Sequence, residues 1–172
     1  MKSHPTKTKF DKFLTWDIET RTIDNKMVPY CICVFDGRNK FSFYLSDHKT
    51  VGAMLLAAIK LIFTKKGDFY KYDGYIVYAH NFSKFDSIFL LKFLSMYSDN
   101  HKYTLDMIRS PRWRESDFIE ISISKPRTFK IKFRDSLLLI QGSLKSLAKG
   151  FGVDQKGTFP YLFVNDINTP FP

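Results

Sequence analysis

Apolar and polar residues alternate with a period of two in the first part of the chain and with a period near 3.6 after it. Strands are predicted over residues 12–20, 28–35 and 40–45, with turns at Asp24-Asn25 and Asp36-Gly37. Residues 51–63 carry apolar side chains at helical spacing. The chain therefore begins as a three-stranded meander followed by a helix.

Strand and helix patterns alternate in the remainder of the chain. Further strands are predicted over residues 74–79, 103–109, 118–124 and 129–134, and further helices over 86–96 and 143–151. Ser143 is suited to cap the last helix and Gly152 to end it. A meander followed by such alternation predicts an α/β fold with a mixed sheet. We expect a tail over residues 1–11, one domain over 12–165 and a second tail over 166–172.

Composition and charge narrow the class of partner. The 172 residues are 44% hydrophobic, enough for one domain with a core. The 27 Lys and Arg residues exceed the 17 Asp and Glu residues and give a net charge of +10, which favours a polyanion such as nucleic acid or an anionic membrane surface. The longest apolar run, 51–59, is too short to span a bilayer. Charge alone does not choose between these two partners, and we expect no membrane-spanning segment.

Cys31 and Cys33 are the only cysteines in the sequence. Strand alternation places both thiols on one face of the second predicted strand. Such a pair is compatible with a metal site or a disulfide. The simpler interpretation, which we adopt here, is two small buried residues.

Three acidic residues interrupt apolar patterns. Asp17 and Glu19 flank Ile18, so their carboxylates share one face of the first strand. Like charges repel unless a cation lies between them, and carboxylate oxygens suit Mg²⁺ or Mn²⁺; a solvated edge strand is the alternative. Asp86 opens a predicted helix on its apolar face, where either a metal ion or the helix dipole would stabilise its charge.

Four segments together resemble the protein-primed branch of the family B DNA polymerases. They are FLTWDIET at 13–20, YAHNFSKFD at 78–86, FRDSLLLIQGSLKSLAKGFG at 133–152 and KGTFPYLFV at 156–164, in the order of the family. The resemblance implies a ribonuclease H-like mixed sheet flanked by helices, C-terminally incomplete, that carries a 3′–5′ proofreading exonuclease acting in DNA replication. It also implies a mitochondrial location, plasmid- or organelle-encoded, and a terminal priming protein as partner of the parent polymerase.

The resemblance assigns roles to individual residues. It implies that Asp17, Glu19 and Asp86 hold two Mg²⁺ or Mn²⁺ ions at the 3′ end of a DNA strand, with Lys156 supporting catalysis beside them. The residues that it assigns to single-stranded DNA are Tyr78, His80, Asn81, Phe85, Phe89, Ser136 and Leu137.

Several of these residues also have a purely structural interpretation. Phe85 and Phe89 are equally suited to core packing, and Lys156 is compatible with an ordinary surface lysine. Asp135, inside the third segment, is expected to be structural rather than a metal ligand.

The fourth metal ligand of the family, the aspartate of a Tyr-x-x-x-Asp motif, has no match. Asn165 follows Tyr161 at that interval and Asp166 lies one residue further, while His101 and Asp106 precede the strand that should come before the motif. Three hypotheses stay open: the exonuclease portion of a longer polymerase, a decayed remnant that at most binds single-stranded DNA, and a stand-alone exonuclease that uses Asp166. Whether the piece is itself an active enzyme is open.

Overall fold

The chain forms one seven-stranded mixed sheet in the computed structural model, which describes residues 12–109 and 118–153. The strands in chain order are β1 Phe13–Ile23, β2 Lys26–Phe35, β3 Lys40–Tyr44, β6 Ile76–Ala79, β7 Thr104–Arg109, β8 Phe118–Lys125 and β9 Phe129–Asp135. Their order across the sheet is β3-β2-β1-β6-β9-β8-β7. β6 runs parallel to both of its neighbours, β1 and β9, whereas the outer pairs are antiparallel. The α/β class with a mixed sheet is confirmed.

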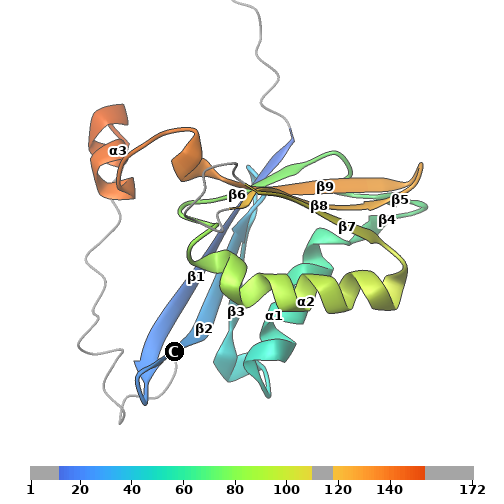
Figure 1. The fold of residues 1–172 in the computed structure, drawn as a ribbon, viewed down its shortest axis with the longest axis horizontal. Helices are drawn as coiled ribbons and strands as arrows, with labels where there is room; N and C mark the ends of the chain where they lie inside the picture. The colour runs from blue at the N-terminus through green and yellow to red at the C-terminus, as the bar shows by residue number, and fades with distance from the viewer. Residues whose placement is uncertain (1–11, 110–117, 154–172) are drawn as a thin grey trace, which may run out of the picture.

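Two helices, α1 Val51–Ile62 and α2 Asp86–His101, lie on the same side of the sheet (Figure 1). The burial of β1 alternates accordingly, with Leu14, Trp16 and Ile18 buried and Thr15 and Asp17 exposed. This alternation follows from the period of two in a strand. It directs Leu14, Trp16 and Ile18 into the core beneath the helices and Asp17 to the opposite face. Within the described residues, no helix is long and apolar enough to cross a membrane.

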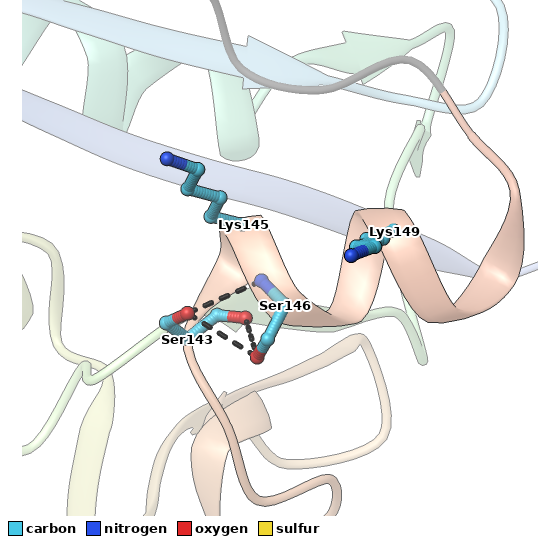
Figure 2. A pocket seen from close by; sticks show the side chains of 4 residues that line it. All are labelled: Ser143, Lys145, Ser146 and Lys149. Atoms are coloured by element: carbon cyan, nitrogen blue, oxygen red, sulfur yellow. Dashed lines mark hydrogen bonds between the residues drawn. The ribbon is translucent and has the colours of Figure 1, made fainter.

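A third helix, α3 Leu144–Phe151, projects away from α1 and α2 (Figure 1). Ser143 caps it as predicted, because its Oγ accepts a hydrogen bond from the Ser146 N–H at 3.2 Å (Figure 2). Gly152 ends it in the left-handed conformation with φ 64°. None of the residues of α3 is buried, and Phe151 is 68% exposed. The helix is therefore held by its caps more than by packing.

Several boundaries differ from the predicted ones: β1 runs to Ile23 instead of 20, β2 begins at Lys26 instead of 28, and β6 begins at Ile76 instead of 74. Two differences are larger. α2 ends at His101 rather than at 96, because Tyr97 packs on Phe63 with ring centroids 4.6 Å apart and the His101 ring stacks on Tyr97 at 4.1 Å. Two strands that were not predicted, β4 Lys65–Lys66 and β5 Phe69–Tyr70, form a separate hairpin. Each has only two residues, too few for a periodic signal.

The prediction for the cysteines is half right. Both thiols lie on one face of β2, and Cys31 is buried, but Cys33 is exposed. Leu45 packs against Cys31, whereas Cys33 pairs across the sheet with the exposed residues Asp17 and Ser42. The difference therefore comes from the neighbouring strands, which the local pattern of β2 does not contain.

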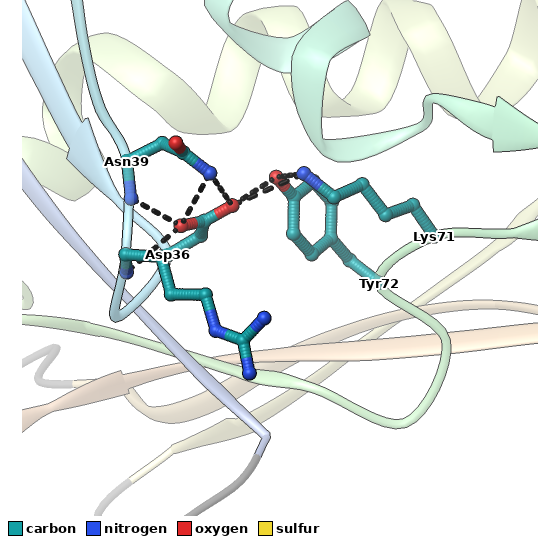
Figure 3. A network of polar contacts seen from close by, with 5 residues as sticks. Asp36, Asn39, Lys71 and Tyr72 are labelled. Atoms are coloured by element: carbon teal, nitrogen blue, oxygen red, sulfur yellow. Dashed lines mark hydrogen bonds and ion pairs between the residues drawn. The ribbon is translucent and has the colours of Figure 1, made fainter.

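A buried carboxylate joins the turn after β2 to the segment before β6 (Figure 3). Asp36 accepts hydrogen bonds from the backbone N–H groups of Arg38 and Asn39, from Lys71 Nζ at 3.1 Å and from the Tyr72 hydroxyl at 3.0 Å. Although burial acts in the opposite direction, these donors hold the pKa of Asp36 far below its usual range. The Asp36 side chain is only 6% exposed, so the network stabilises the fold rather than a solvated surface.

Replacing Asp36 with alanine is expected to lower the free energy of unfolding by about 2–4 kcal/mol at neutral pH, because Lys71 and two backbone N–H groups lose their acceptor. The folded-state pKa of Asp36 is depressed. Its stabilisation is therefore present above the unfolded-state pKa of about 3.9 and lost as the pH falls below it. Urea denaturation over a pH series measures both effects. Asp68→Ala, on the exposed turn between β4 and β5, is the control, and equal losses at neutral pH would contradict the prediction.

Candidate functional site

The two acids of β1 lie on the face of the sheet opposite the helices. Asp17 is exposed and Glu19 is half-buried. In the antiparallel pairing of β1 with β2, Asp17 lies opposite Cys33 and Glu19 lies opposite Cys31. The register shifts directly after Glu19, between Glu19 and Thr20, where Pro29 enters the pairing. A bulge suits this point because proline has no N–H to give to the ladder. The predicted common face of Asp17 and Glu19 is confirmed.

Asp86 reaches β1 because the neighbouring strand ends early. β6 pairs with β1 only from Phe13 to Thr15 and ends at Ala79, so the chain then turns away before α2 begins at Asp86. This leaves the edge of β1 beyond Thr15 open to the start of α2. The Asp86 carboxyl group lies there close enough to Asp17 and the Ile18 backbone for both to affect its pKa.

A second buried carboxylate fixes the loop that carries Asp86. Asp135, at the end of β9, is 2% exposed and accepts hydrogen bonds from Ser83 N–H at 3.0 Å, Ser83 Oγ at 2.9 Å and Leu137 N–H at 2.9 Å. These donors satisfy the carboxylate, as expected of a structural aspartate; that Asp135 is no metal ligand stays a prediction. Ser83 lies three residues before Asp86, so the Asp135–Ser83 tether sets where α2 starts.

The environment of Asp86 disfavours its charge. Asp86 is 2% exposed. Burial first, and the charges of Asp17 and Asp135 after it, raise the pKa of Asp86 to about 8, although backbone N–H groups of Asp86 and Ile18 act in the opposite direction. A carboxyl group in such a position is protonated at neutral pH unless a cation compensates its charge.

The residues fit a divalent cation in one decisive respect. Asp86 Oδ1 is buried and has no hydrogen-bond partner, which is rare for a buried polar atom and marks a place for a cation or a proton. Within residues 12–109 and 118–153, however, no three His, Cys, Asp or Glu side chains lie close enough together to hold a metal ion. The structure brings Asp86 to Asp17, and the metal site with Glu19 stays a prediction.

His80 and Ser136, both assigned to DNA by the resemblance, contact each other. His80 Nδ1 lies 3.1 Å from Ser136 Oγ, and His80 Nε2 lies 3.0 Å from the Gly142 carbonyl oxygen. Because a carbonyl only accepts, Nε2 carries the hydrogen and Nδ1 accepts from Ser136. His80 therefore ties the end of β6 to the segment that leads into α3. Its contact with DNA stays a prediction.

The other residues assigned to DNA surround the start of α2. The Phe85 and Phe89 rings are half-buried and meet edge to face with centroids 5.7 Å apart. Asn81 has a positive φ of 61°, and its carbonyl accepts from the Phe85 N–H at 3.1 Å. Tyr78 is half-buried on β6. After the larger effect of Glu120, a hydrogen bond between the Tyr78 hydroxyl and Arg134 contributes to raising the pKa of Arg134. Leu137 is half-buried beside Asp135.

The structure does not describe four of the sequence positions considered for the site, and it places a fifth far from Asp86. Lys156, Tyr161, Asn165 and Asp166 lie outside the described residues. His101 is at the far end of α2 from Asp86, about 22 Å along the helix at 1.5 Å per residue. The expectation that His101 does not belong to the site is therefore confirmed.

Comparison with known proteins identifies the family. Residues 67–172 match the family model described as DNA polymerase type B, organellar and viral. The chain belongs to this family. Relatives include a "Probable DNA polymerase" of Ascobolus immersus, 30% identical over 164 residues, and one of Neurospora intermedia, 30% identical over 176 residues. The matches cover 91% and 92% of this chain but only 12% and 17% of those relatives, so this type B polymerase chain spans a small part of their length.

Solved structures of Phi29 DNA polymerase share the fold of this type B polymerase chain. An orthorhombic crystal form gives a TM-score of 0.63 at 18% identity and covers 88% of this chain and 25% of that one. The complex with single-stranded DNA gives a TM-score of 0.58 at 16% identity, covering 87% and 25%. The likeness confirms the predicted fold, an α/β mixed sheet flanked by helices.

Ser83 is the site residue that the sequence did not reveal. It lies inside the stretch 78–86, where attention falls on Asp86 and the aromatic residues. Its role depends on Asp135, which is 52 residues away in the chain and adjacent only after β6 and β9 have paired. The one available sequence signal for this role was that Asp135 was expected to be structural and that Ser83 lies shortly before the candidate ligand Asp86.

The raised pKa of Asp86 predicts an unusual stability profile for this polymerase segment. A carboxyl group whose folded-state pKa is raised stabilises the fold at low pH, and the stability falls as the pH rises between about 4 and about 8. Without divalent cations, Asp86→Asn is therefore expected to unfold with a free energy about 2–5 kcal/mol higher than wild type at about pH 9, and with a similar one at about pH 4. Denaturant unfolding at both pH values measures this.

Asp106→Asn, on the exposed part of β7, is the control and should show no gain at high pH. Mn²⁺ is expected to stabilise wild type at high pH and to stabilise Asp86→Asn less, because binding to the folded state alone shifts the equilibrium. An Asp86→Asn variant that is less stable than wild type at both pH values would contradict the account.

Proposed function

We propose that this chain is the 3′–5′ proofreading exonuclease portion of a type B DNA polymerase and hydrolyses the terminal phosphodiester of a single DNA strand. The observation that supports it most directly is the buried Asp86 carboxyl group, which has one unpartnered oxygen and lies beside Asp17 on the open edge of β1. Membership of the type B polymerase family gives this pair of acids a substrate, and the likeness to structures solved with primer-template and single-stranded DNA is in keeping with it.

Each residue of the site has a proposed task. Asp17, Glu19 and Asp86 would hold Mg²⁺ or Mn²⁺, which supplies a hydroxide at neutral pH and stabilises charge on the leaving oxygen. Asp135 and Ser83 hold the start of α2, so that the Asp86 carboxylate meets Asp17 without rearrangement. Lys156 would stabilise negative charge on the scissile phosphate.

The proposal extends to the DNA strand. Phe85 and Phe89 offer aromatic faces beside Asp86, and stacking on such faces accepts any base. Lys145 and Lys149, exposed one turn apart on α3, line an open hollow with Ser143 and Ser146 (Figure 2). Lys132 and Arg134, by contrast, pair with the buried Glu120 at 2.9 and 2.6 Å. We therefore assign the backbone contacts to α3 rather than to β9.

The location and partners of the parent polymerase belong to the same proposal. We propose a mitochondrial location, plasmid- or organelle-encoded, and a terminal priming protein as partner of the parent polymerase. The family description, organellar and viral, is in keeping with an organellar location.

Metal-dependent release of nucleotides tests the central proposal. A single-stranded DNA labelled at its 5′ end is incubated with the chain in the presence of Mn²⁺, and shortening from the 3′ end is followed by gel. We expect shortening that is lost in Asp17→Asn and in Asp86→Asn by at least about 100-fold, since each removes a ligand of the metal, and kept in Asp106→Asn.

Two further outcomes of this assay decide between the alternatives. Loss of activity in Asp166→Asn would favour a stand-alone exonuclease that uses Asp166. Strand binding without shortening, unchanged by Mn²⁺ and by Asp17→Asn, would contradict the exonuclease proposal and favour a non-catalytic remnant that binds single-stranded DNA.

The role of α3 is tested by strand binding under varied salt. The double variant Lys145→Ala/Lys149→Ala is expected to bind single-stranded DNA more weakly. It should also lower the slope of log affinity against log salt by about 1.4, since each phosphate contact contributes about 0.7 for single strands. Lys65→Ala/Lys66→Ala on β4 removes the same charge elsewhere and should leave the slope almost unchanged. Equal slopes for the two double variants would contradict the assignment.

A further inference from the structure

The outer face of β1, β2 and β3 carries six polar side chains in two rows. They are Asp17, Cys33 and Ser42 in one row, and Glu19, Cys31 and Tyr44 in the other. Each row runs across the three strands, because residues that are paired in register share a face. The two thiols therefore occupy the middle strand, with carboxylates on one side and hydroxyls on the other.

The two thiols lie close together, share a hydrogen bond and form no disulfide. Cys31 Sγ and Cys33 Sγ are 3.8 Å apart, and Cys33 Sγ lies 3.7 Å from Ser42 Oγ. Cys31 is 5% exposed and Cys33 is exposed. A small ion therefore reaches the pair from the side of Cys33, without opening the core.

The 3.8 Å between the sulfur atoms is the length of the thiol–thiol hydrogen bond, and the same separation fits metal ligation. Two sulfur atoms bound at about 2.3 Å to a tetrahedral Zn²⁺ are about 3.8 Å apart. A disulfide needs a separation of about 2.05 Å and a distance between Cα atoms that residues two apart in an extended strand reach only at its upper limit. The strand therefore holds the two sulfur atoms at a distance that suits a shared cation and that is too long for a disulfide bond.

We propose that Cys31 and Cys33 form a binding site for one thiophilic divalent cation of the Zn²⁺ class. The two sulfur atoms exchange their protons for the cation, and both protons are released to solvent. Water completes the coordination, because in the described part of the chain no third His, Cys, Asp or Glu side chain lies close enough to be a ligand. The carboxylates of Asp17 and Glu19 on the adjacent strand favour a positive charge at this position.

This site differs in chemistry from the proposed exonuclease site. Soft thiolate ligands select Zn²⁺ and its heavier relatives, whereas carboxylate oxygens suit Mg²⁺ and Mn²⁺. The thiol site does not rest on the exonuclease proposal, and either of the two can fail without the other.

Cd²⁺ is the probe, because thiolate-bound Cd²⁺ has a charge-transfer absorption band in the ultraviolet that oxygen ligands do not produce. The full chain, reduced and freed of metal, is titrated with Cd²⁺, and the remaining thiols are counted with a thiol reagent. We expect one thiolate-bound Cd²⁺ per chain, measured by the band, together with protection of both thiols and displacement by Zn²⁺ but not by Mg²⁺. Because the chain has only two cysteines, every thiol signal belongs to this pair.

Variants make the test decisive. Cys33→Ser is expected to abolish the band and to weaken Cd²⁺ binding by more than about 100-fold, since even indirect partners of a metal ligand contribute about 10–100-fold. Asp17→Asn should keep the band, because both thiols remain. If circular dichroism shows that Cys33→Ser does not fold, wild type alkylated at the exposed Cys33 replaces it. Cd²⁺ binding without the band, or binding kept in Cys33→Ser and lost in Asp17→Asn, would overturn the proposal.

Discussion

The position of the Asp86 carboxyl group is the constraint on which the site depends. It is buried beside the charge of Asp17, and one of its oxygens has no hydrogen-bond partner. Without a bound cation this arrangement lowers the stability of the fold, because burial and the charge of Asp17 disfavour the ionised Asp86 more than its backbone hydrogen bonds favour it. The fold nevertheless enforces it, since β6 leaves β1 early and the Asp135–Ser83 tether fixes the start of α2. A site that binds a cation explains why these elements converge.

The rest of the fold keeps the elements that stabilise the sheet apart from those that surround Asp86. The core beneath α1 and α2 and the Asp36 network stabilise the sheet on the side away from the acids. His80 links β6 to the segment before α3, so the basic helix is connected to the loop that positions Asp86. The outer face of β1, β2 and β3 carries the two rows of polar side chains around Cys31 and Cys33. The proposed strand binding by α3 and the proposed metal chemistry of β1 therefore lie apart from the core that stabilises the sheet.

The sequence predicted what depends on local pattern. The period of two gave β1, β2 and β3, and the caps of α3 followed from Ser143 and Gly152. It placed Asp86 on the apolar face of its helix, but it could not predict the contact of Asp86 with Asp17, which depends on where β6 parts from β1. It also could not predict the exposure of Cys33, which depends on its neighbours on β1 and β3. The longer α2 depends on Tyr97 packing against Phe63. In each case a contact between segments distant in the chain overrode or completed the local signal.

The most direct test is the pKa of Asp86 itself, followed by the carbon-13 chemical shift of its carboxyl group in the metal-free protein. The account predicts a pKa of about 8. It also predicts a lower value in Asp17→Asn, because that variant removes the neighbouring charge but not the burial. A titration near the ordinary value of about 3.9 that is the same in both proteins would contradict it.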